Sequence, residues 1–200
     1  FVGFGGRVMG KGEPKYLNSP ETLVYHKRRE LYNLHQSKTF LMETKVALIV
    51  EGYLDLIALW QYGVRNVVAT LGTALTSDHV RLMKRFVESA VVVFDGDSAG
   101  IQAAMRSIDV FLEEEFPVRV LVLPQGQDPD DAVRKEGKEA FERRVSQAQD
   151  IFDFKWDITA KRFDIRDANQ MTRLSQEMLD LIWKVKSPVL QDRYLRELAG

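Results

Sequence analysis

The stretch Ala90-Val91-Val92-Val93-Phe94-Asp95-Gly96-Asp97-Ser98-Ala99-Gly100 decides the fold prediction for this chain. Its first five residues are apolar and mostly β-branched, which is typical of a short strand buried on both faces. An amphipathic run from about residue 101 to 115 follows and predicts a helix. Since extended residues at i and i+2 point the same way, Asp95 and Asp97 direct two carboxylates toward one spot.

Two interpretations of this acidic turn are open. Crowded carboxylates repel one another unless a cation lies between them, so the turn is a candidate metal site. It is equally a candidate for a plain polar connection in which Ser98 or Asp97 caps the following helix. The segment taken alone does not distinguish them.

The bulk composition narrows the class of protein. With 200 residues, 45% of them hydrophobic, the chain can build one large domain or one and a half smaller ones. The absence of cysteine excludes disulfides and thiolate zinc sites, and three scattered histidines argue against a zinc hydrolase. No apolar run approaches the roughly 20 residues of a membrane-spanning helix. Because residues 1–4 resemble the middle of a strand, we interpret the chain as an excised fragment.

Charge is distributed unevenly along the chain. Residues 1–45 carry eight Lys/Arg and four Asp/Glu, whereas the remaining residues carry 20 and 25. The basic segment contains Gly5-Gly6 with Arg7, Lys15 and Asn18 around it, a set that could grip phosphates. A solvated surface loop is an equal alternative, and the phosphate interpretation gains only if an acidic metal site follows.

The pattern of strand, acid and helix recurs. Residues 46–50 predict a buried strand that ends at Glu51, and Asp55 lies one turn into the next predicted helix, residues 53–61. Further strands are predicted at 66–70 and 118–122, the latter followed by the loop that carries Asp128 and Asp130. Strands that alternate with helices form a mostly parallel sheet, and sites form at the carboxyl ends of its strands. The acids therefore predict a Mg²⁺ site for phosphate chemistry on nucleotides or nucleic acid.

The pattern changes after residue 137. Helices are predicted at 27–43 and 77–86, the second with Ser77 as its N-cap, and only helices are predicted beyond 137. We expect three parts: a basic Gly/Pro-rich segment (1–45), the α/β domain (46–137) and a helical subdomain (138–200).

Several motifs resemble a known family. Glu51-Gly52-Tyr53-Leu54-Asp55 and Asp95-Gly96-Asp97-Ser98-Ala99-Gly100 resemble the two halves of the Toprim signature of bacterial primases, topoisomerases and some nucleases. The segments Gly3-Phe4-Gly5-Gly6-Arg7-Val8 and Pro14-Lys15-Tyr16-Leu17-Asn18-Ser19-Pro20-Glu21 narrow this to bacterial DnaG-type DNA primases. Asp128-Pro129-Asp130 with Arg134-Lys135-Glu136-Gly137 is similar as well. The resemblance covers residues 1 to about 145.

The resemblance implies a Toprim-type α/β fold with a small all-helical C-terminal domain, in an enzyme that makes short RNA primers on single-stranded DNA from ribonucleoside triphosphates. It implies that Glu51, Asp95 and Asp97 are catalytic and hold Mg²⁺ or Mn²⁺, supported by Asp55, Asp128 and Asp130. It implies nucleotide and DNA contacts by Arg7, Lys15, Tyr16, Asn18 and Lys27.

The resemblance also implies a cytoplasmic, non-membrane protein of the bacterial replisome. The zinc-binding domain and the C-terminal domain that binds the replicative helicase are expected to be absent from this chain, so no zinc is expected. Two alternatives stay open: a Toprim-type Mg²⁺-dependent nuclease, and a non-catalytic module that binds nucleotides or nucleic acid.

Overall fold

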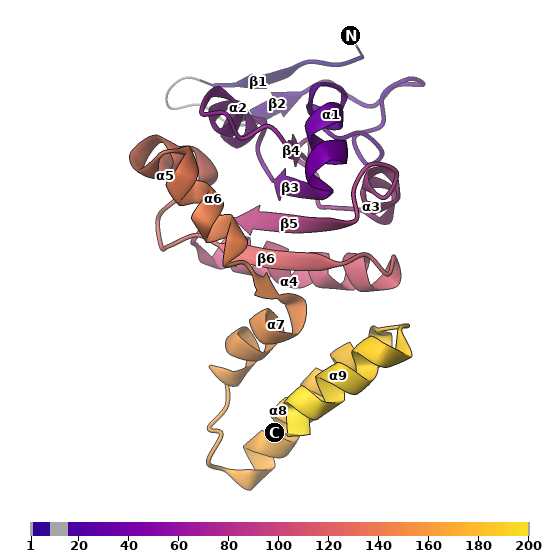
Figure 1. Cartoon of the computed structure of the whole chain (residues 1–200), viewed down its shortest axis with the longest axis vertical. Coiled ribbons are helices and arrows are strands. Elements are labelled where there is room, and N and C mark those ends of the chain that lie inside the picture. Colours follow the sequence, from indigo (N-terminus) through magenta and orange to yellow (C-terminus); the bar gives the residue numbers. More distant parts are fainter. Residues whose placement is uncertain (1, 9–15, 200) are drawn as a thin grey trace.

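The computed structural model describes residues 2–8 and 16–199. A short antiparallel pair, β1 (Gly5–Arg7) and β2 (Tyr16–Asn18), lies at one end of the molecule (Figure 1). A five-stranded sheet follows, with the strand order β4-β3-β5-β6-β7. Its strands are β3 (Val46–Val50), β4 (Val67–Ala69), β5 (Ser89–Phe94), β6 (Val118–Val122) and β7 (Gln149–Asp150).

Helices connect these strands and complete the chain. They are α1 (Leu34–Thr44), α2 (Tyr53–Gln61), α3 (Ser77–Met83), α4 (Ser98–Glu113), α5 (Pro129–Glu136), α6 (Lys138–Ser146), α7 (Ile151–Ala160), α8 (Ala168–Lys184) and α9 (Pro188–Ala199). In Figure 1, α7, α8 and α9 lie beyond the β6 side of the sheet. None of the described helices is long and apolar enough to span a bilayer.

Strands β3, β4, β5 and β6 of this sheet are parallel, and only β7 runs antiparallel to its neighbour. Strand β3 pairs with β4 on one side and with β5 on the other, so the chain reverses direction across the sheet after β4. Such a reversal opens a crevice outside the carboxyl ends of the two central strands.

Alternate residues of each strand enter two separate cores, as expected for a sheet covered on both faces. Ile49, Val92 and Val120 belong to one core, which also contains residues of α1, α3, α4, α7, α8 and α9. Leu48 and Val91 belong to the other, with residues of α2, α5 and α6. The C-terminal helices therefore share a core with one face of the sheet.

Most predicted elements are confirmed. Residues 2–4, expected to lie in the middle of a strand, precede β1 and belong to no strand, and three further predictions are wrong. The helix predicted from residue 27 begins only at Leu34, because Tyr32 forms a bridge with Ala69 and Asn33 is left-handed (φ 69°). The cap of α3 is Thr76 rather than Ser77. A further strand, β7, follows residue 137: it has no apolar run of its own and exists through pairing with β6.

Candidate active site at the carboxyl edge of the sheet

The crevice between β3 and β5 places Glu51 and Asp95 at adjacent strand ends. Two glycines make the turn after β5 possible. A side chain at Gly96 would collide with the carbonyl oxygen of Pro124, and one at Gly100 with the carbonyl oxygen of Asp95. The two glycines of this motif are therefore required by close backbone packing.

A cavity of about 510 Å³ opens at this edge. Its wall includes four carboxylates, from Glu51, Asp55, Asp95 and Asp128. Tyr16 and Asn18 of β2 line it from the other side, together with the loop 72–75 that precedes α3. The structure thus brings together six of the residues that the sequence analysis selected.

The carboxylates of the cavity influence one another. Partial burial, followed by the charge of Asp95, raises the pKa of Glu51, while Arg106 opposes the shift. The pKa of Asp55 rises from 3.8 to about 7, chiefly through burial and then through the charges of Asp128 and Asp95. The cavity therefore favours either protons or cations.

Three of the predicted acids also have local structural roles. Asp97 accepts a hydrogen bond from the Gly100 N–H (2.7 Å) and caps α4, which confirms the capping interpretation of the turn. Asp128 caps α5 through the Asp131 N–H (2.7 Å) and still lines the cavity. Asp130 forms an ion pair with Arg134. Asp97 and Asp130 do not line the cavity.

The donor set suits a hard divalent cation, because every charged oxygen donor in the cavity is a carboxylate. Within residues 2–8 and 16–199, however, no three acidic or histidine side chains form a ready-made ligand group. The fit is therefore to an ion such as Mg²⁺, which accepts one or two carboxylates and completes its shell with water and phosphate oxygens. The metal assignment stays a prediction.

The N-terminal hairpin contributes an aromatic wall. The rings of Tyr16 and Tyr53 meet edge to face, with centroids 5.6 Å apart, and the Arg7 guanidinium lies 5.8 Å from the Tyr16 ring centre. Asn18 Nδ2 donates to the carbonyl oxygen of Leu71 (3.2 Å), which joins the hairpin to the loop after β4. Lys15, the other predicted phosphate ligand of this segment, lies outside the described residues.

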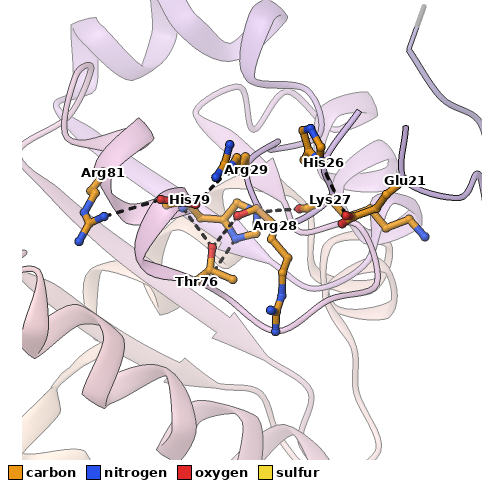
Figure 2. A network of polar contacts seen from close by, with 9 residues as sticks. Glu21, His26, Lys27, Arg28, Arg29, Thr76, His79 and Arg81 are labelled. Carbon is orange, nitrogen blue, oxygen red and sulfur yellow. Dashed lines mark hydrogen bonds and ion pairs between the residues drawn. The ribbon is translucent and has the colours of Figure 1, made fainter. Parts of the chain in front are cut away.

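Lys27 belongs to a basic turn, residues 27–29. Hydrogen bonds from the start of α3 hold the backbone of this turn in place (Figure 2). The His79 ring is fully buried, and its Nδ1 accepts from the Thr76 N–H (3.2 Å). Its Nε2 therefore carries the proton and donates to the Lys27 carbonyl oxygen (2.9 Å). Thr76 Oγ1 donates to the Arg28 carbonyl oxygen (2.7 Å). Lys27 itself does not line the cavity, but its anchor directly follows the cavity loop 72–75.

Sequence reasoning missed Tyr53, Thr73 and Arg106 in the cavity wall. Arg106 was detectable in principle, because it is a cationic residue on the helix that starts at the acidic turn. Thr73 carries no sequence signal, since its position depends on how the loop after β4 packs.

Three family descriptions match the chain. Residues 48–133 match "Toprim-like", residues 1–38 match "DNA primase catalytic core, N-terminal domain", and residues 152–200 match "DnaB-helicase binding domain of primase". The last match falls on the C-terminal helices, whereas the sequence analysis expected the helicase-binding region to be absent.

The chain aligns along nearly its full length with DNA primases of known bacteria. The DNA primase of Escherichia coli K12 is 43% identical over 202 residues, and that of Clostridium acetobutylicum is 39% identical over 201. These alignments cover 100% and 99% of this chain but 35% and 33% of the relatives, so the chain spans about a third of their length.

Solved structures agree with the fold. A DnaG primase catalytic domain bound to ssDNA superposes with a TM-score of 0.89 at 42% identity, covering 99% of this chain and 65% of that one. A DNA primase domain from Pseudomonas aeruginosa gives a TM-score of 0.91 at 40% identity, with 99% and 63% coverage.

Proposed function

The chain belongs to the family of bacterial DnaG-type DNA primases, as a segment of their catalytic core, and on this premise we propose that it carries the metal-dependent centre of primer synthesis. The reaction is nucleotidyl transfer from ribonucleoside triphosphates onto a growing RNA primer, directed by a single-stranded DNA template. The observation that carries the proposal is the cavity at the switch point of the sheet, where Glu51 and Asp95 lie at adjacent strand ends.

Glu51, Asp95 and Asp97 would hold Mg²⁺ or Mn²⁺, with Asp55, Asp128 and Asp130 as supporting acids. When bound, such an ion neutralises phosphate charge and polarises the phosphoryl group that is transferred. The raised pKa values of Glu51 and Asp55 support this assignment, because a cation would offset both the burial and the neighbouring acids that raise them.

The chain's own residues would position the reactants. Tyr16 is 39% exposed and offers a ring face or edge for a base, and Arg7 beside it offers a guanidinium for phosphate. Asn18 keeps an unpartnered, buried Oδ1 at the cavity. Lys15 and Lys27 would add phosphate contacts along the template path, consistent with the ssDNA bound to the related catalytic domain.

The match of residues 152–200 supports a second partner, the replicative helicase, docked on the C-terminal helices. A protein with these two partners would work in the bacterial replisome, in the cytoplasm.

The test is primer synthesis on single-stranded DNA with ribonucleoside triphosphates and Mg²⁺. Glu51→Gln and Asp95→Asn each remove one carboxylate charge and should reduce the rate by about 100-fold or more. Asp180→Asn, an exposed substitution on α8, is the matched control and should retain activity. Full activity in both cavity variants would refute the assigned roles. Shortened DNA products in the absence of nucleotides would instead indicate a nuclease.

A further inference from the structure

Arg106 lies on the α4 side of the cavity, on the same helix face as Ala103 and Ser107. It is the one Lys or Arg among the described residues that line this cavity, and it shares the wall with four carboxylates. Arg106 is an exposed side chain of a helix that is otherwise held by buried apolar residues such as Ile108 and Phe111. The core therefore does not explain why an arginine stands at this position.

No hydrogen bond or ion pair joins the Arg106 guanidinium to a described residue, although its charge acts on Glu51 and opposes the rise in the pKa of that carboxyl. Arg81, Arg134 and Arg144 are each paired with a carboxylate, whereas Arg106, like the exposed Arg173, has no ion pair with a described residue. What distinguishes Arg106 is its place in the cavity wall. Within residues 2–8 and 16–199, nothing therefore takes up the five N–H donors of Arg106, which a ligand can use.

The other free polar groups of the cavity indicate the kind of ligand. Asn18 Oδ1, Tyr53 Oη and Thr73 Oγ1 are buried, line the cavity and have no hydrogen-bond partner. A ligand that pairs with both Arg106 and these three atoms needs anionic oxygens for the guanidinium. It also needs neutral hydroxyl or amine groups for the three atoms. A nucleotide has both, in its phosphates and in its sugar and base.

We propose that Arg106 is a further nucleotide-binding residue, which contacts a phosphate of the incoming ribonucleoside triphosphate from the α4 side of the cavity. This inference rests on the proposed function and adds to it a contact outside the Toprim acids and the N-terminal basic segment. A triphosphate that enters a cavity walled by four acids needs cationic partners on more than one side, and a guanidinium binds phosphate oxygens in a bidentate way.

The experiment compares Arg106→Gln and Arg106→Lys with the control Arg173→Gln, an exposed arginine of α8. Primer synthesis at saturating single-stranded DNA separates the KM for ribonucleoside triphosphate from kcat, and calorimetry measures binding of ATP and of adenosine in Mg²⁺. Loss of one charged hydrogen-bonding partner corresponds to a rise in KM of about 10–100-fold for Arg106→Gln. Arg106→Lys should recover part of it, and the control should match the wild type.

The Arg106→Gln variant should lose affinity for ATP but not for adenosine. Its affinity for single-stranded DNA should stay within about twofold of the wild type. An Arg106→Gln variant with wild-type KM and ATP affinity would overturn the inference and leave the proposed function standing. Weakened DNA binding with an unchanged KM would also overturn it, because Arg106 would then contact the template. A wild-type protein that neither binds ATP nor makes primers would overturn the proposed function first.

Discussion

Replacement of Asp55 by asparagine should stabilise the protein in the absence of divalent ions. The folded pKa of Asp55 is about 7 against 3.8 for an ordinary aspartate, so above pH 7 the fold must hold a carboxylate that it disfavours. Because the folded state binds the proton more tightly than the unfolded state, stability falls as pH rises from about 4 to about 7. Asparagine keeps the shape and removes the charge.

The size of the effect follows from the shift. About 3 pKa units at about 1.4 kcal/mol each give an upper bound of about 4 kcal/mol above pH 7. Asp55 is only partly buried and salt screens its neighbours, so we expect about 2 kcal/mol. For a chain of this size that corresponds to a rise in Tm of about 4–8 °C.

The assay is thermal unfolding in EDTA at pH 8 and at pH 4.5. The advantage of Asp55→Asn over the wild type should be large at pH 8 and should shrink at pH 4.5, where the wild-type carboxyl is protonated in the folded state. Asp180→Asn should shift Tm little at either pH. Added Mg²⁺ should raise the Tm of the wild type more than that of the variant. A variant no more stable than the wild type at pH 8 would refute the reasoning.

Three further predictions concern individual contacts of the fold. Tyr194→Phe removes the hydrogen bond from the buried hydroxyl to Asp150 Oδ1 (2.7 Å) and should lower the free energy of unfolding by about 1–2 kcal/mol in urea titrations, whereas Tyr62→Phe at an exposed ring should not. Gly100→Ala forces a Cβ against the Asp95 carbonyl oxygen and should destabilise the fold by about 1–3 kcal/mol, measured in the same way; an unchanged urea midpoint would contradict the close packing of this turn. Thr76→Val removes the α3 cap and the anchor of the basic turn, with an expected loss of about 1–2 kcal/mol in thermal unfolding and weaker binding of single-stranded DNA; unaltered DNA affinity would show that the anchor does not position the turn.

Features that depend on neighbouring residues were predictable from the sequence. The bounds predicted for β3, α2 and β6 match the structure, because buried strands and amphipathic helices have a local period. The acids at the strand ends were likewise predictable. Each directly follows an apolar run, and that run is visible in the sequence alone. The DnaG-type resemblance rests on the same short motifs.

Features that depend on distant segments required the tertiary structure. The sequence does not contain the strand order, and only that order puts Glu51 beside Asp95 rather than elsewhere along the edge. The same holds for β7, which exists through pairing with β6. Arg106 and Thr73 enter the cavity wall because α4 and the loop after β4 pack around one crevice. Local periodicity therefore determined which residues are buried and which end a strand, whereas the packing of remote elements decided which of them meet.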